Sequence, residues 1–209
     1  MKVLVIDYGM SNLGSIRRAL EECGADVLVS DEPGDLKEAS HVVLPGVGAF
    51  GDGMRNLTDR GWPAQLTKIV VDEGIPLLGI CLGMQLLADR GFEGGEHGGL
   101  GLVPGEVKRL VAGAADERIP HVGWNEIFQV GENPLLVDIN DGTDFYFVHS
   151  YHFIATEDRF VVARTPYCGG FSSVVCRENV FGVQFHPEKS GPMGFKLLKN
   201  FLDFWKAGG

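Results

Sequence analysis

The sequence predicts an α/β fold: a mostly parallel central sheet covered by helices on both faces, with antiparallel additions in the C-terminal half. Over the first 90 residues, short apolar runs alternate with segments whose apolar residues recur at helical spacing. The runs are nearly continuous, which is typical of parallel strands buried on both faces. The C-terminal half instead holds short strand-like segments separated by turn residues. We expect residues 1–209 to form one domain, since no linker or repeat divides them.

The N-terminal half contains strands and helices in alternation. Aliphatic runs predict strands at residues 2–6, 25–29, 41–46 and 76–80. Helical periodicity and breaker residues predict helices at residues 13–23, in a short segment after Pro33, over residues 50–73 with breaks near Gly61 and Pro63, and at residues 82–90. Ser11 or Asn12 can cap the first helix, and Gly24 ends it.

The C-terminal half contains seven short strand-like segments and one long helix. The strands are expected at residues 105–110, 124–130, 145–148, 151–156, 160–164, 172–176 and 181–185. The final helix is expected at residues 193–205, with Phe195, Leu198, Leu202 and Trp205 on one apolar stripe.

Composition limits the classes of function. The chain has 209 residues, of which 44% are apolar, and a formal net charge of −10, which disfavours binding to nucleic acid or an anionic membrane. Its four cysteines (Cys23, Cys81, Cys168 and Cys176) match neither a zinc pattern nor a dense disulfide framework. The N-terminal apolar run is broken at Asp7, too early for a signal peptide, and no apolar run is long enough to span a membrane. We therefore expect a reduced, cytoplasmic enzyme.

Cys81 stands in the segment Gly79-Ile80-Cys81-Leu82-Gly83, which has the form G-x-C-x-G. This is the nucleophile-elbow pattern with cysteine in place of serine. A sharp strand-to-helix turn would raise the thiol above the sheet, and the helix N-terminus would favour a thiolate. The next backbone N–H, that of Leu82, could donate to an oxyanion. The alternative is a buried structural cysteine between two glycines.

A thiolate nucleophile needs a base and a group that orients the base. His186 ends an apolar strand, and Glu188 follows two residues later, so in an extended segment both side chains project to the same side. The alternative is a solvated strand end. In the segment 44–48, Gly46 and Gly48 leave the backbone bare, so that an N–H could turn toward the cysteine; a plain glycine loop remains the alternative.

The remaining histidines give no metal site. His149 and His152 are three residues apart, which in a strand sends their side chains to opposite faces, and a third close ligand is missing. His41, His97 and His121 have no partner that the sequence identifies.

The segments "LPGVGAFG", "GICLGMQ" and "GVQFHPEKS", in this order, resemble the class I, triad-type glutamine amidotransferases. The segments "PHVGWN" and "FYFVHSYHF" are similar to those of the amidotransferase subunits that serve imidazole glycerol phosphate synthesis. The resemblance runs from Asp7 to the final helix. It implies one amidotransferase domain with a flavodoxin-like fold.

The resemblance also implies a role for individual residues. It makes Cys81 the nucleophile, His186 the general acid and base, and Glu188 the group that orients His186. The oxyanion would be bound by the amides of Leu82 and Val47. Glutamine would lie beside Gly48, Gln85, Glu93, Ser150 and Tyr151, with Glu93 the weakest transfer because it depends on an offset across a glycine-rich stretch. The partner-facing residues would be Asn12, Trp124, Asn125 and Lys189.

The same resemblance implies a separate partner. No G-x-x-x-x-G-K-[ST] loop is present to activate an acceptor with ATP. A (β/α)-barrel cyclase subunit, forming a heterodimer with this chain, would therefore receive the ammonia released from glutamine. The partner would convert a phosphoribosyl-formimino ribonucleotide to imidazole glycerol phosphate and an aminoimidazole carboxamide ribonucleotide. No cofactor or metal is expected.

Three other functions compete with this interpretation. An α/β-hydrolase or a DJ-1/PfpI-type hydrolase shares the cysteine elbow, but the first places its acid well before the histidine and the second commonly has histidine where Leu82 stands. A flavodoxin-like binding module would have a Ser/Thr-rich phosphate loop, which the loop after the first strand lacks. An amidotransferase subunit for anthranilate or GMP synthesis would share the triad, so only "PHVGWN" and "FVHSY" disfavour it.

Overall fold

The N-terminal half forms the expected alternation of strands and helices in the computed structural model, which describes residues 1–115 and 117–204. Its elements are β1 (Lys2–Ile6), α1 (Leu13–Glu22), β2 (Asp26–Ser30), η1 (Pro33–Glu38), β3 (His41–Gly46), α2 (Phe50–Asp59), α3 (Trp62–Thr67), the π-helical η2 (Lys68–Asp72), β4 (Leu77–Cys81) and α4 (Leu82–Leu86).

The C-terminal half is dominated by strands. Its elements are β5 (Arg90–Gly91), β6 (His97–Gly98), β7 (Gly105–Arg109), β8 (His121–Gln129), η3 (Pro134–Leu136), β9 (Thr143–His149), β10 (Tyr151–Ala155), η4 (Asp158–Phe160), β11 (Val161–Thr165), β12 (Phe171–Arg177), β13 (Val180–Val183), η5 (Pro187–Lys189) and α5 (Gly191–Asp203).

A nine-stranded mixed sheet crosses the molecule in the order β2-β1-β3-β4-β13-β12-β11-β8-β9. Strands β2, β1, β3, β4 and β13 are parallel, and the remaining pairs are antiparallel. The α/β fold with a parallel centre and antiparallel additions is therefore confirmed. The prediction that every late strand is an antiparallel addition is wrong for β13, which pairs in parallel with β4. This pairing brings the end of β13 beside the end of β4.

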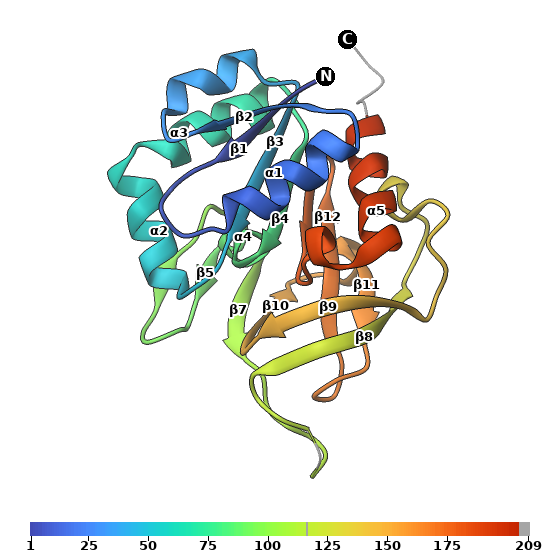
Figure 1. The fold of residues 1–209 in the computed structure, drawn as a ribbon. Helices are drawn as coiled ribbons and strands as arrows, with labels where there is room; N and C mark the ends of the chain where they lie inside the picture. Colours follow the sequence, from blue (N-terminus) through green and yellow to red (C-terminus); the bar gives the residue numbers. More distant parts are fainter. Residues whose placement is uncertain (116, 205–209) are drawn as a thin grey trace.

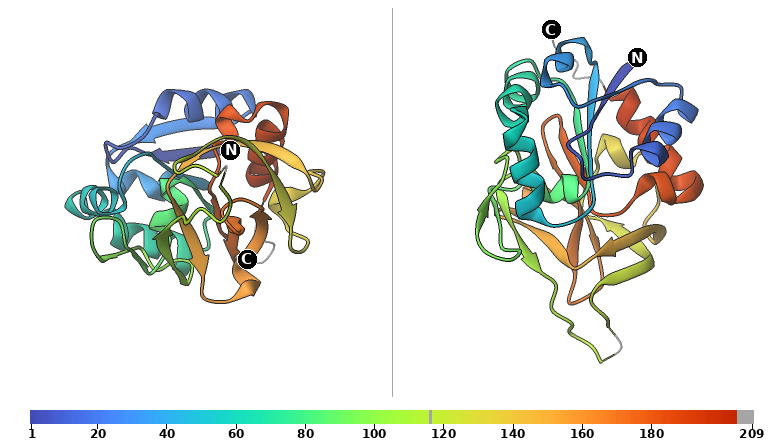
Figure 2. Two further views of the ribbon diagram at one scale, coloured as in Figure 1. Left: turned by 90° about the horizontal axis from the view of Figure 1, so that it is seen from below. Right: turned by 60° about the vertical axis from the view of Figure 1, so that its left-hand side comes forward.

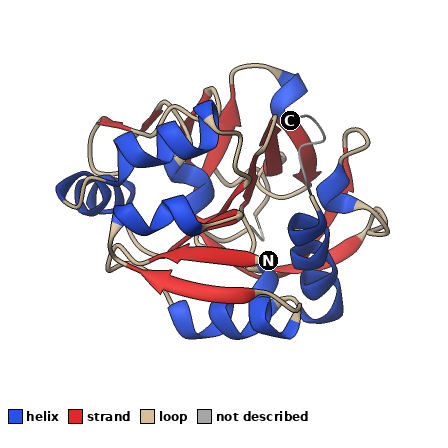
Figure 3. Ribbon diagram, turned by 90° about the horizontal axis from the view of Figure 1, so that it is seen from above, coloured by secondary structure: helices blue, strands red, loops and turns tan. Residues whose placement is uncertain are grey.

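Helices cover both faces of the parallel strands (Figures 1 and 3). Alternation along β1 shows how the two faces separate, because successive side chains of a strand point to opposite sides. Val3 and Val5 pack in one apolar cluster with residues of α1 and α5. Leu4 and Ile6 pack in a second cluster with residues of α2, α3 and α4. The continuous apolar run in β1 thus reflects burial on both faces.

The second sheet was not predicted. It consists of four strands in the order β10-β7-β5-β6. Strands β5 and β6 have only two residues each and lie at the start of the glycine-rich segment 91–101 and within it. Such short strands have no periodicity that a sequence can reveal. The described residues of the loop between β7 and β8 project at one end of the molecule (Figure 2), where Glu117 and Arg118 form hydrogen bonds with Cys168 and Tyr167.

Several predicted boundaries are wrong in detail. Helix α4 ends at Leu86 instead of residue 90, because the chain turns there to enter β5. The predicted break near Gly61 and Pro63 is confirmed, since α2 ends at Asp59 and α3 begins at Trp62, with Pro63 in its first turn, where proline is tolerated. Trp205, expected on the apolar stripe of the last helix, lies outside the described residues. Within residues 1–115 and 117–204, no helix is long and apolar enough to span a membrane.

Candidate active site

Cys81 lies at the corner between β4 and α4. Its backbone has φ 54° and ψ −109°, which is strained for a residue with a side chain. A Cβ on Gly79 would lie 2.7 Å from the carbonyl oxygen of Gly83, and a Cβ on Gly83 would lie 1.8 Å from that of Leu44. Glycine is therefore required on both sides of Cys81, and the G-x-C-x-G spacing forms a tight elbow.

A cavity of about 450 Å³, here called the main cavity, opens beside Cys81. The loop after β3, the elbow and the turn between β9 and β10 contribute to its wall. The sequence-predicted residues in its lining are Val47, Gly48, Cys81, Leu82, Gln85, Glu93, Ser150 and Tyr151. Residues that the sequence analysis did not place there are Ala49, Pro120, Val148 and His149. The fold thus brings together every residue predicted to surround glutamine.

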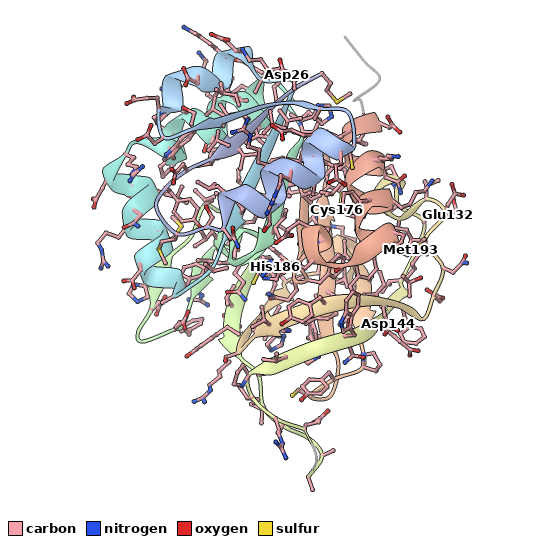
Figure 4. The ribbon with its side chains drawn as sticks, in the orientation of Figure 1. Asp26, Glu132, Asp144, Cys176, His186 and Met193 are labelled. Carbon is pink, nitrogen blue, oxygen red and sulfur yellow. The ribbon has the colours of Figure 1, made fainter. Side chains whose placement is uncertain are left out.

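His186 and Glu188 are in contact directly after β13. Nδ1 of His186 lies 2.8 Å from Oε1 of Glu188, and both side chains are almost fully buried. Nδ1 therefore carries a proton and donates a hydrogen bond to the carboxylate of Glu188. The expectation of an extended segment is wrong, because Pro187–Lys189 forms the short 3-10 helix η5. The turn, instead of strand alternation, brings Glu188 back to the imidazole of His186, which lies near the centre of the molecule in Figure 4.

Ser190 holds this turn in place. Its hydroxyl donates to the carbonyl of His186 at 2.6 Å and accepts from the backbone N–H of Tyr146 at 3.0 Å. The His186 N–H donates to the carbonyl of Tyr146 at 2.9 Å. These bonds fix the His186 backbone against β9. The sequence analysis did not assign Ser190, although a small polar residue ending a proline turn is a recognisable signal.

The electrostatics of the site favour the protonated imidazole. Burial alone would lower the pKa of His186, but interactions with Cys81 and Glu188 outweigh it and raise the pKa to about 9. Nε2 of His186 is buried and makes no hydrogen bond within the described residues. The Cys81 sulfur is thus near enough to influence the charge of the imidazole while lying outside hydrogen-bond geometry.

Val47 lines both the main cavity and a second space of about 10 Å³, here called the small cavity. The small cavity is lined by Asn12, Ile16, Pro45, Gly46, Val47, Ile80, His186, Glu188 and Lys189. The backbone N–H of Val47 donates to the carbonyl of Met10 at 2.8 Å. In this structure the Val47 N–H is therefore used by the loop after β1.

Gln85 is held against the wall of the main cavity by two acceptors. Its Nε2 donates to the carbonyl of Tyr151 at 2.9 Å and to Oε1 of Gln184 at 3.0 Å. Nε2 of Gln184 lies 3.7 Å from the Cys81 sulfur. The sequence analysis missed Gln184, which is fully buried. Its signal was a polar residue in an otherwise apolar run, two residues before His186.

Glu93 joins the glycine-rich segment to helix α2. Its Oε2 accepts from the backbone N–H of Phe50 at 2.9 Å, the first amide of that helix. A carboxylate is favourable at a helix N-terminus. Glu93 therefore has a structural contact as well as a place in the wall of the main cavity.

Three of the four residues expected to face a partner lie close to the small cavity or to Tyr146, and the fourth, Asn125, contacts His121. Asn12 and Lys189 line the small cavity together, and Nζ of Lys189 lies 6.0 Å from the centre of the Tyr146 ring. The Trp124 ring meets the same tyrosine edge-on at 6.0 Å and is 57% exposed. Asn125 is half-buried, and its Nδ2 lies 3.2 Å from Nε2 of His121.

Two of the histidines that the sequence left without partners, His41 and His121, do have them. His41 is fully buried, with Nε2 3.0 Å from the carbonyl of Phe204. His121 and His149 contact each other beside the main cavity, with Nδ1 of His121 3.0 Å from Nε2 of His149. In the part of the chain that the structure describes, no three His, Cys, Asp or Glu side chains are grouped to hold a metal ion.

The sequence and the geometry agree with one class of enzyme. The family described as glutamine amidotransferase class-I matches residues 4–204, and the chain belongs to this family of enzymes. It is 48% identical over 207 residues to the imidazole glycerol phosphate synthase subunit HisH of Moorella thermoacetica, covering 99% of this chain and 97% of the relative. The subunit of the same name from Aquifex aeolicus is 45% identical over 202 residues, with 96% of each chain covered.

Solved structures agree in fold. The chain resembles a chain in the structure of PurLQS from Thermotoga maritima with a TM-score of 0.74 at 22% identity, covering 96% of this chain and 97% of that one. At this identity the likeness extends to the fold only. It supports the same arrangement of sheet and helices around the elbow.

Proposed function

We propose that this chain is the glutaminase subunit of an imidazole glycerol phosphate synthase in histidine biosynthesis. The observation that carries the proposal is the assembly of a strained elbow cysteine, a buried His–Glu pair at 2.8 Å and a cavity of about 450 Å³ in one place. Cys81 serves as nucleophile, His186 as acid and base, and Glu188 holds the imidazole by Nδ1.

The reaction proceeds in two stages. The Cys81 thiolate attacks the side-chain carbonyl carbon of glutamine, and His186 donates its Nε2 proton to the leaving nitrogen, which departs as ammonia. A water molecule then attacks the glutamyl thioester while the neutral His186 accepts its proton, and glutamate leaves as the thiolate forms again. A raised pKa suits the first stage, because the acid must be protonated before the nitrogen leaves.

The oxyanion of each stage is bound by the amides of Leu82 and Val47 in this proposal. The Val47 N–H donates to the Met10 carbonyl, so this bond must break before the amide can face the main cavity. Gly46 and Gly48 flank the peptide, and Gly48 has φ 115°, a conformation that glycine adopts freely. A liganded partner would activate the glutaminase by favouring the turned peptide. An active complex in which this amide still faces Met10 would contradict that step.

Glutamine itself would lie against Gly48, Gln85, Glu93, Ser150 and Tyr151, all in the wall of the main cavity. Polar groups and bare backbone converge there on a space large enough for an amino acid. The carboxylate of Glu93 would bind the amino group of the substrate while its Oε2 also accepts from the backbone N–H of Phe50 at the start of α2.

The partner in the proposal is a (β/α)-barrel cyclase that forms a heterodimer with this chain in the cytoplasm and receives ammonia through a channel. The names of the relatives support a synthase subunit, in preference to an amidotransferase for anthranilate or GMP synthesis. Residues 1–209 act as one domain in this assignment. Asn12, Trp124, Asn125 and Lys189 form the contact surface, which the position of Asn12 and Lys189 at the small cavity supports.

Glutamate release tests the proposal. The chain is assayed with glutamine alone, with the cyclase, and with the cyclase and its nucleotide ligand, using Cys81→Ala as the blank. Release that rises severalfold or more with the liganded partner and vanishes in the blank supports the proposal. Absence of glutamate in every condition would overturn it and favour a cysteine-elbow hydrolase with another substrate.

A further inference from the structure

A line of hydrogen bonds connects the half-buried side chain of Asn125 on β8 with the wall of the main cavity. Nδ2 of Asn125 lies 3.2 Å from Nε2 of His121, and Nδ1 of His121 lies 3.0 Å from Nε2 of His149. Nδ1 of His149 lies 2.8 Å from the carbonyl oxygen of Tyr151. The line ends at the residue that also accepts from Gln85.

The acceptor at the end of the line fixes the direction of every bond. A carbonyl oxygen only accepts, so Nδ1 of His149 must carry a proton. In a neutral imidazole the other nitrogen is then an acceptor, so Nδ1 of His121 must carry a proton as well. Nε2 of His121 is left as an acceptor, which the amide NH₂ of Asn125 satisfies. One carbonyl therefore specifies the tautomers of two histidines and the orientation of one amide.

The surroundings keep this line intact. Both histidines are buried, and burial lowers the pKa of His121 to about 4 and that of His149 to about 3, so both rings are neutral at physiological pH. The His121 ring also stacks between the rings of Phe147 and Tyr167, with centroids 5.0 and 4.1 Å away. A stacked neutral ring has one orientation in which both of its nitrogens are satisfied.

The line controls backbone that faces the main cavity. The Leu110 N–H donates to the carbonyl of Ser150, so this pair is hydrogen-bonded between β7 and β10. The next pair is then of the non-hydrogen-bonded kind, and the N–H and C=O of Tyr151 both point away from β7. On the side away from β7, the Tyr151 carbonyl accepts hydrogen bonds from His149 and Gln85. The Tyr151 N–H points to the same side, and Tyr151 lines the main cavity.

From this geometry we infer that His149 and His121 are positioning residues for the glutamine site: the line Asn125–His121–His149 holds the Tyr151 peptide and Gln85 in the conformation that receives the substrate. This inference rests on the proposed glutaminase function. It adds a route by which the partner could affect the substrate site. A change in the hydrogen bond of Asn125, on the surface assigned to the partner, alters the tautomers of His121 and His149 and so the hydrogen bond to the Tyr151 carbonyl. Neither histidine touches the reacting atoms.

Two variants of one residue test the inference in the complex with the cyclase and its nucleotide ligand. His149→Asn retains an N–H donor near the position of Nδ1, and His149→Leu removes it. We expect His149→Leu to raise KM for glutamine roughly five- to tenfold, the loss of one buried hydrogen bond, with a small change in kcat. His149→Asn should return KM most of the way to the wild-type value. Equal KM values for the two variants would overturn the inference.

A matched control separates positioning from stability. His41 is an equally buried histidine bonded to the backbone of Phe204, outside the site. His41→Leu should lower the melting temperature and leave KM unchanged, and an equal rise in KM would show that His149 acts through general destabilisation. If the wild-type complex releases no glutamate, the proposed function fails instead.

A second readout does not depend on activity. The ¹⁵N spectrum of the free chain with labelled histidine distinguishes protonated from bare ring nitrogens. We expect His121 and His149 to be neutral at pH 7 with the proton on Nδ1, the minor tautomer of free histidine in water. A proton on Nε2 of either ring would overturn the assignment of the line, whatever the glutaminase assay shows.

Discussion

A double-mutant cycle at Gly46 and Tyr8 tests how the strand next to the nucleophile is packed. Gly46 pairs with Cys81 across β3 and β4 and precedes the Val47 peptide. A Cβ on Gly46 would lie 2.1 Å from the hydroxyl oxygen of Tyr8 and 3.0 Å from Cβ of Leu82. The Tyr8 hydroxyl is buried and has no hydrogen-bond partner within the described residues. The Tyr8 hydroxyl is therefore the nearest obstacle to a side chain at position 46, with Leu82 and the backbone N of Gly83 as further close contacts.

The structure gives the sign and size of each change. Gly46→Ala should lower the free energy of unfolding by about 3 kcal/mol, the upper end for an overpacked core, since the overlap exceeds 1 Å. Tyr8→Phe should be neutral or stabilising by about 1 kcal/mol, because it removes a buried polar group without a partner. In the Tyr8→Phe background, Gly46→Ala should cost only about 1 kcal/mol, from the remaining contact with Leu82.

Urea unfolding of the four proteins measures this cycle. Gly14→Ala is the matched control, because a Cβ there meets nothing within 4 Å and alanine favours helix α1, so the variant should gain up to about 1 kcal/mol. If Gly46→Ala costs the same in both backgrounds, the Tyr8 hydroxyl is not the reason that glycine stands beside the nucleophile, and the packing argument fails.

Three further predictions concern the turn after β13. With His186 as the acid, kcat/KM for glutamate release should fall as pH rises through about 9, because the pH profile of kcat/KM reports groups of the free enzyme. Glu188→Gln should move this limit to lower pH, because the carboxylate is one cause of the raised pKa of His186, and an unmoved pH profile would contradict the orienting role. Ser190→Ala should lower kcat and cost about 1–2 kcal/mol of unfolding free energy through its two hydrogen bonds, as measured in urea, whereas an unchanged kcat would show that the turn holds without it. Lys189→Ala should weaken binding to the cyclase in a titration, while Lys196→Ala, whose side chain pairs with an exposed carboxylate elsewhere, should not.

The parallel half of the fold was predictable because a strand buried on both faces has a nearly continuous apolar sequence. Residues 2–6 and 41–46 are mostly apolar on both faces and adopt the expected strands with the expected limits. The pairing of β13 with β4 was not predictable from period, since a short apolar strand pairs equally well in either direction until its neighbours are known. The two-residue strands β5 and β6 likewise depend on tertiary pairing alone.

The candidate site shows the same division between local and distant causes. The elbow at Cys81 was visible because both of its glycines lie within five residues of sequence, although the clash that requires Gly83 is with the carbonyl oxygen of Leu44 on the neighbouring strand β3. The contact of His186 with Glu188 was expected, but for the wrong geometric reason, because Pro187 starts a turn. The bonds of Gln184, Ser190 and the His121–His149 pair join segments from different strands, and a single sequence contains no signal for such contacts beyond the residue types themselves.

Glutamate release by the complex remains the most direct test of the account, with Cys81→Ala as the blank and the cyclase supplied with and without its nucleotide ligand. The account predicts slow release by the chain alone, a rise of severalfold or more with the liganded partner, and none from the blank. Release that is equally fast without the partner would contradict the gating role given to the Val47 peptide, and release that survives Cys81→Ala would contradict the nucleophile on which the whole account depends.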